Sequence, residues 1–146
     1  MKYESIKLGL LSMVDDMLSH TEKYLSSFGS NSQAIFGMSE EEIKKAHARY
    51  RRYTTTILSC IARADAFAAE LSLLVCQADL EMDNEKTELY SLLLDEYCRW
   101  KSSVAEFMET NDILFANKKA GFKCSDLVAA AQKLYEASKF LRTKLI

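Results

Sequence analysis

The chain lacks proline entirely and has only four glycines among its 146 residues. Average usage would give about seven prolines in a chain of this length, and turns and loops normally contain several of them. Few positions are therefore suited to sharp turns, which favours long helices over strands joined by hairpins. The length fits a single domain, residues 1–146, that can bury a core without disulfides or metals.

The cysteine pattern argues against a disulfide framework or a zinc site. The four cysteines lie in different parts of the chain and form no Cys-x-x-Cys pair: Cys60, Cys76, Cys98 and Cys124. Scattered cysteines are typical of small buried side chains in a reducing compartment. We therefore expect a cytoplasmic protein with no metal and no cofactor.

Long apolar runs are also missing. The apolar patch Leu8–Val14 is cut short by Asp15 and Asp16, whereas a membrane-spanning helix needs about 20 apolar residues. We expect neither a signal peptide nor a membrane partner. The balance of 19 basic and 21 acidic residues, a net charge of -2, argues against wholesale coating of nucleic acid.

The strongest pattern that is present predicts one long helix from Ser39 to about Met82. Two rows of mostly apolar residues recur every seven positions, as in a coiled-coil seam. Ser39 and Glu42 form a capping box at the start of this helix. One row is Ile43, Tyr50, Ile57, Ala64, Leu71 and Ala78, and the other is Ala46, Tyr53, Cys60, Phe67 and Leu74.

Three further amphipathic helices are predicted at about residues 3–28, 85–119 and 125–145. The apolar row that begins at Tyr90 is out of phase with the preceding seam, so we place a turn at residues 83–84. One continuous helix with a skip in phase is the alternative.

The fold prediction that follows is an all-α, up-down four-helix bundle with a long central antiparallel helical hairpin. The two central helices are longer than the first and the last. Part of the hairpin must therefore project beyond the bundle, bend back on it or pair with another chain.

Sequence signatures of catalysis are missing. We find no Glu-x-x-His pair of a di-iron bundle, no Gly-x-Ser-x-Gly elbow and no phosphate-binding Walker loop. The motifs of HEPN nucleases and of MazG-type pyrophosphatases are not matched either. The acidic run Asp79, Glu81 and Asp83 lacks the glycine and the final glutamate of a calcium loop. We interpret it as a solvated acidic corner and expect no catalytic residue.

One short motif resembles a known site. His20-Thr21-Glu22-Lys23 matches the His-x-x-Lys core of histidine phosphotransfer domains, which are four-helix bundles. The resemblance implies an exposed His20 that relays a phosphoryl group and a Lys23 that supports the added charge. In that family a glycine follows, whereas Tyr24 stands here on an apolar row. The alternative is a histidine at the flank of the bundle.

Basic residues gather at one end of the predicted bundle, and acidic residues gather at the other. The antiparallel hairpin brings the basic group together: Lys44, Lys45, Arg49, Arg51, Arg52, Lys118 and Lys119. Tyr50 and Tyr53 lie among the arginines, a combination found on nucleic-acid-binding surfaces. Both tyrosines are also seam residues, so a salt-bridged face is the alternative.

Ile35 and Phe36 are unexpectedly apolar for a connector between two helices. They either seal the open end of the core or dock into a partner. With the basic end, they are the predicted partner-binding residues.

These observations favour a non-enzymatic helical module that acts through contacts with another protein. It would serve as an adaptor, a chaperone-like accessory protein or a small inhibitor, and a homo-oligomer formed through the hairpin is a further option. Nucleic-acid binding by the basic end and phosphotransfer through His20 are the alternative functions.

Overall fold

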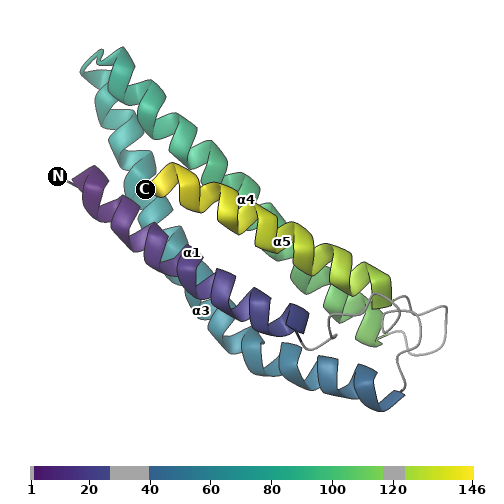
Figure 1. The fold of residues 1–146 in the computed structure, drawn as a ribbon. Helices are drawn as coiled ribbons and strands as arrows, with labels where there is room; N and C mark the ends of the chain where they lie inside the picture. The colour runs from purple at the N-terminus through teal and green to yellow at the C-terminus, as the bar shows by residue number, and fades with distance from the viewer. Residues whose placement is uncertain (1, 27–39, 117–123) are drawn as a thin grey trace.

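The computed structural model describes residues 2–26, 40–116 and 124–146, which form an up-down bundle of four helices (Figure 1). The main contacts join α1 to α3 and α5, and join α4 to the same two helices. Each helix therefore packs beside two neighbours in a ring, and the predicted all-α four-helix bundle is confirmed. The helices are α1 (Lys2–Ser26), α3 (Glu40–Leu80), α4 (Asn84–Ala116) and α5 (Cys124–Leu145).

The two central helices are longer than the outer two, as predicted. α3 has 41 residues and α4 has 33, against 25 in α1 and 22 in α5. Two contacts mark how far α1 and α5 reach along α4. The centroids of the Tyr3 and Tyr90 rings lie 4.8 Å apart near the start of α1, and Lys144 near the end of α5 lines the same hollow as Leu93. Beyond these levels α3 and α4 continue as a pair, so the hairpin projects from the bundle (Figure 1).

A tight turn separates α3 from α4, where the sequence predicts it. The Met82 amide donates to the Asp79 carbonyl at 3.0 Å, and the Asp83 amide donates to the Ala78 carbonyl at 2.9 Å. These two bonds are typical of a helix C-terminus that is followed by a residue in the left-handed conformation. Met82 is that residue, with a φ of 57°. The Asp83 carboxylate then accepts from the Lys86 amide at 3.2 Å and caps α4. The alternative of one continuous helix is therefore wrong.

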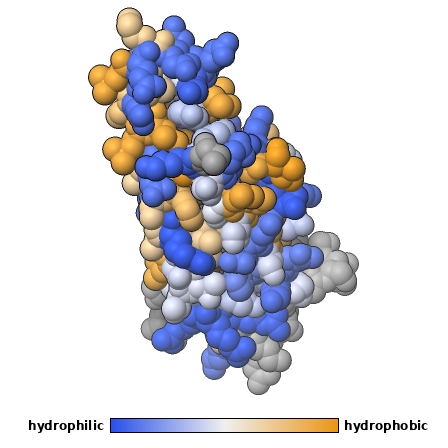
Figure 2. Space-filling view, turned by 90° about the vertical axis from the view of Figure 1, so that its left-hand side faces the viewer, coloured by the Kyte–Doolittle hydropathy of each residue, from blue (hydrophilic) through white to orange (hydrophobic). Residues whose placement is uncertain are grey.

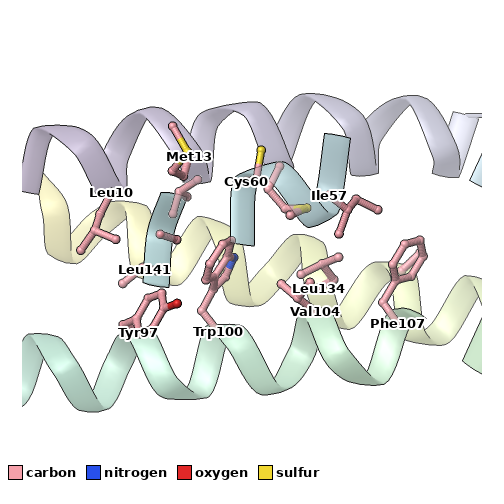
Figure 3. Close-up of a cluster of buried hydrophobic side chains, with 14 of the residues drawn as sticks. Leu10, Met13, Ile57, Cys60, Tyr97, Trp100, Val104, Phe107, Leu134 and Leu141 are labelled. Atoms are coloured by element: carbon pink, nitrogen blue, oxygen red, sulfur yellow. The ribbon is translucent and has the colours of Figure 1, made fainter. Parts of the chain in front are cut away.

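The predicted seam of α3 faces the interior of the bundle. Tyr50, Ile57, Ala64, Leu71 and Ala78 are all buried. Fully burying a large apolar side chain contributes about 1.5–3 kcal/mol, so Tyr50, Ile57 and Leu71 of this seam each stabilise the bundle. Side chains from the other three helices pack with them in the core (Figure 3), among them Leu10, Met13, Tyr97, Trp100, Val104, Phe107, Leu134 and Leu141.

Two buried hydrogen bonds connect specific positions across the core. The Tyr24 hydroxyl donates to Asn111 Oδ1 at 2.7 Å, and Asn111 Nδ2 donates to the Phe107 carbonyl at 2.8 Å. Trp100 Nε1 donates to Ser138 Oγ at 2.9 Å. An unpaired buried polar group costs about 1–3 kcal/mol, and a slip by one turn would unpair these groups. The bonds therefore fix the register of α4 against α1 and α5.

A polar cluster lies at the edge of the interface between α3 and α4. The Asp65 carboxylate accepts a hydrogen bond from the Tyr97 hydroxyl and pairs with Lys101 Nζ at 2.9 Å. The hydrogen bond from Tyr97, together with Lys101, holds the pKa of Asp65 below its usual value. Burial and the neighbouring carboxylate raise the pKa of Tyr97, so its hydroxyl remains the donor.

Gly9 lets the backbone of α1 approach α3 closely. A Cβ atom at this position would overlap the half-buried ring of Phe67. Glycine inside a helix costs about 1 kcal/mol relative to alanine. The close contact with Phe67 offsets this cost. Packing therefore requires glycine at position 9, although glycine weakens the isolated helix.

Met82→Gly should raise the free energy of unfolding by about 1 kcal/mol, because glycine adopts a left-handed backbone without a Cβ clash. Met82→Ala removes the same exposed side chain but keeps the Cβ atom, so its stability should stay near that of the wild type. Urea denaturation followed by circular dichroism measures both. A lower midpoint for the glycine variant than for the alanine variant would contradict the role given to this turn.

Gly9→Ala should lower the free energy of unfolding by about 1–2 kcal/mol, because overpacking against Phe67 outweighs the gain in helix propensity. In a Phe67→Ala background the same change should instead stabilise the protein by up to about 1 kcal/mol. Denaturation of the four proteins in this double-mutant cycle measures the coupling. Equal effects in both backgrounds would show that the two residues do not oppose each other.

Asp65→Asn should destabilise the protein at neutral pH by about 1 kcal/mol, a figure reduced for the partial exposure of the ion pair. The pKa of Asp65 is lowered in the folded state. Its contribution is therefore complete above the unfolded pKa of about 4 and is lost as the pH falls through the folded value.

Urea midpoints measured from neutral pH into the acid range should fall less steeply for Asp65→Asn than for the wild type. Glu106→Gln, which breaks the exposed 2.7 Å pair with Lys133, is the matched control and should change stability by less than about 1 kcal/mol. Parallel curves for the wild type and Asp65→Asn would refute this account.

Candidate functional site

The arginines of the predicted basic end lie on the surface of α3. Arg49, Arg51 and Arg52 are exposed, and so is Lys44. None of the ion pairs among the described residues involves these arginines. Their guanidinium groups therefore form an exposed basic patch, and the alternative of a salt-bridged face has no support at these three positions.

The two tyrosines between the arginines are engaged within the bundle. Tyr50 is buried, and its hydroxyl donates to Asp112 Oδ1 at 3.1 Å. The Tyr53 ring lies 5.3 Å from the His20 ring, measured between centroids. Both tyrosines therefore pack as seam residues, and the arginines stand without the aromatic faces on which single-stranded nucleic acid stacks.

The other predicted contact residues lie outside the described part of the chain. These are Ile35 and Phe36 in the connector, Lys118 and Lys119 after α4, and the side chain of Lys45. Their roles, and the gathering of the lysines beside the arginines, stay predictions.

His20 is a half-buried residue on the flank of α1. Its Nδ1 atom is buried and has no hydrogen-bond partner among the described residues. Tyr24, which stands where the phosphotransfer family has glycine, is only 1% exposed and belongs to the core. The contacts agree with the alternative of a flank histidine, and phosphotransfer through His20 stays a prediction.

Large apolar side chains are exposed at the free end of the hairpin. We call Leu80, Met82, Leu89 and Leu92 the free-end surface; they are 84%, 85%, 48% and 57% exposed. In Figure 2 apolar side chains stand among hydrophilic ones on the upper part of the molecule, where the hairpin projects. Scattered exposed leucines need no explanation, but a group of them at one end marks a contact surface.

The free-end surface continues the face of α4 that packs against α5. Glu96 and Trp100 line the groove that α4 forms with α5, and Leu89 and Leu92 follow on the same face closer to the turn. Where α5 stops, a hollow of about 220 Å³ is lined by both leucines and by Lys144. A helix that continued the line of α5 would cover this hollow.

A second exposed apolar pattern lies on α3, and the sequence analysis missed it. We call it the outer row; its members are three or four residues apart, as in a heptad seam. All its members are exposed: Leu58, Ala62, Ala66, Ala69, Leu73, Cys76 and Leu80. A scan of α3 for two heptad registers instead of one would have found it, but its alanines give a weaker signal than the aromatic seam.

α4 and α5 form a groove of about 570 Å³ between them. Trp100 at its floor is 1% exposed and already bonded to Ser138. Its rim carries both signs of charge, including Arg99, Lys133 and Glu136. These charged side chains are exposed and of mixed sign, so the groove has no defined polar centre around which a specific ligand site could form.

Within the described ranges, no three His, Cys, Asp or Glu side chains come together in a way that could hold a metal ion. None of the described helices is both long and apolar enough to cross a bilayer.

No protein family, curated protein or solved structure was found that matches this chain. The basis for a functional assignment is therefore the chain's own surfaces: the free-end surface, the outer row and the exposed arginines.

Proposed function

We propose that this chain is a non-enzymatic helical module that binds another protein through the free-end surface of its hairpin. The observation that carries the proposal is the exposure of Leu80, Met82, Leu89 and Leu92, between 48% and 85%, along the hairpin from its turn to the level where α1 begins and α5 ends. Removing such side chains from water on binding yields about 25 cal/mol for each Å² of apolar surface.

The ligand that fits this surface best is an amphipathic helix. The hollow beside Leu89 and Leu92 lies on the line of α5, beyond its last residues. A partner helix placed there would pack on α4 as α5 does, with apolar residues at helical spacing. Glu96 and Lys144 at the edge of the hollow can pair with charges of either sign on such a helix.

The exposed arginines at the other end of α3 would add orientation more than affinity. Charged groups at the rim of an interface mainly steer association and exclude wrong partners. An adaptor or accessory protein uses this combination, with an apolar contact for affinity and a charged end for direction.

The described polar side chains of the core support a non-enzymatic role. Asn111 and Ser138 are fully buried and bonded to Tyr24 and Trp100, and Asp65 is engaged with Tyr97. These groups serve the packing of the helices, and catalysis would require polar groups aimed at a substrate.

Leu89→Glu/Leu92→Glu should abolish capture of a protein partner while the fold is kept. The full-length chain, immobilised and exposed to nuclease-treated extract of its source cells, should retain a protein that the double variant does not retain. Leu8→Glu is the matched control, because Leu8 is an exposed leucine, 66% exposed, on α1. Quantitative mass spectrometry of the eluates, followed by binding of the purified partner, measures the difference.

Retention should also persist from low to moderate salt, because an apolar contact depends little on ionic strength, whereas phosphate binding weakens steeply. Equal retention by the wild type and the double variant would refute the proposal. In a parallel experiment with extract that has not been treated with nuclease, recovery of nucleic acid that is lost in Arg51→Glu/Arg52→Glu and in moderate salt would favour the alternative function of the basic end.

A further inference from the structure

The outer row of α3 is an apolar helix face with no partner inside the described bundle. Its leucines, Leu58, Leu73 and Leu80, are 52%, 70% and 84% exposed. The row points directly away from the bundle, because Ala64 and Leu71 on the opposite side of the helix are fully buried. Apolar side chains at this spacing form the seams of coiled coils.

We propose that the outer row pairs with the outer row of a second copy of this chain, in antiparallel orientation, to form a homodimer. A two-fold axis brings identical surfaces together. Ala66 of each copy faces Ala69 of the other at the centre, and these small side chains let the helices approach closely. Further out, Leu73 of each copy packs over Ala62 of the other. This pairing covers Leu80, which also belongs to the free-end surface, but it leaves Leu89 and Leu92 open, so it can occur with or without a partner bound at those two leucines.

The charges that flank the centre of the row select the antiparallel orientation. In this register Arg63 of each copy lies beside Glu70 of the second copy, so an attractive pair forms twice. A parallel pair would instead place Asp65 beside Glu70 of the second copy, and the like charges would repel each other. Arg63 contacts Asp16 only at 3.8 Å, with both side chains about half exposed, so its guanidinium is available to the second copy.

The two ends of α3 are complementary in the same register. Arg52 lies two heptads before Ala66, and Asp83 lies two heptads after Ala69. In this register Arg52 of one copy is therefore level with Asp83 of the second copy. The exposed basic patch of one copy thus faces the turn of the other copy, where carboxylates gather at the surface. The two helices would lie along each other for about 45 Å, at 1.5 Å of rise per residue. The residues that face each other are Arg49, Arg51 and Arg52 on one copy and Asp79, Glu81 and Asp83 on the other.

The antiparallel pairing also has a consequence for the hairpins. Because the two α3 helices run in opposite directions, the projecting ends point to opposite ends of the dimer. Leu89 and Leu92 lie on α4, outside the outer row, so they would stay open in both copies. The dimer would then expose Leu89 and Leu92 of both copies, one pair toward each end.

Sedimentation equilibrium of the full chain should show a dimer that dissociates on dilution. Ala66→Glu and Leu73→Glu should each raise the dimer dissociation constant by at least about tenfold, because they place charges in the seam. Leu8→Glu, at a comparably exposed leucine on another helix, should leave the constant unchanged. Circular dichroism verifies that each variant keeps its helices.

The native Cys76 reports the orientation. In the antiparallel register Cys76 lies beside Ser59 of the second copy, so Ser59→Cys, with Cys98 and Cys124 replaced by serine, should give a disulfide-linked dimer under mild oxidation. Removing Cys76 by Cys76→Ala from that protein should abolish the linked dimer. A parallel pair would bring Cys76 against Cys76 of the second copy and would link the chain without the Ser59→Cys change.

A monomer at every concentration up to about 100 μM, or a dimer that Ala66→Glu and Leu73→Glu do not weaken, would overturn the pairing. Linkage through Cys76 alone would overturn the antiparallel orientation. These results leave the free-end proposal intact, because Leu89→Glu/Leu92→Glu tests it without altering the outer row. Two results together support the proposal. The dimer is weakened by the outer-row variants and not by Leu8→Glu, and a disulfide links it only when Cys76 and the Ser59→Cys change are both present.

Discussion

Burial of the long α3 seam is the constraint on which the rest of the structure depends. A helix cannot hide an apolar stripe against itself, and this one is 41 residues long. α4 follows it along most of its length, but α1 and α5, with 25 and 22 residues, cannot cover it to its end. The projecting hairpin and its exposed leucines follow from this mismatch in length, and no special sequence at the turn is needed to produce them.

Apolar burial alone would not choose one arrangement of four such helices, because it has no direction. The buried polar groups supply that choice. Asn111 joins α4 to Tyr24 across the bundle, and Ser138 joins α5 to Trp100. Each bond forms in one register only, and any other register leaves a donor or acceptor buried without a partner. The apolar core of all four helices supplies stability, and the polar pairs supply specificity.

α3 carries a different apolar pattern on each of two opposite faces. The inner face carries the aromatic and aliphatic seam, and the outer row carries alanines and leucines at heptad spacing. Nothing inside the described bundle requires the second pattern, since a solvent-facing stripe is stable with polar residues. Its regularity, the opposite charges at the two ends of α3 and the open leucines of the hairpin all support a molecule built to contact other helices.

The sequence by itself determined the class of fold and the main elements. The absence of proline, the two rows of α3 and the change of phase before Tyr90 predicted four helices and the turn near Asp83, because helical periodicity is local and can be read along the chain. It also placed Tyr50 on the seam of α3, where it is buried.

Only the tertiary structure decided which apolar positions stay uncovered. Leu73, Leu80 and Leu89 are apolar like core residues, but Leu73 and Leu80 stand on the face of α3 that points away from the bundle, and Leu89 lies beside the end of α5. The contact between the His20 and Tyr53 rings joins residues far apart in the chain, and so does the close approach of Gly9 to Phe67. Periodicity shows that a helix has an apolar face, but whether a neighbour covers that face is a property of the assembled bundle.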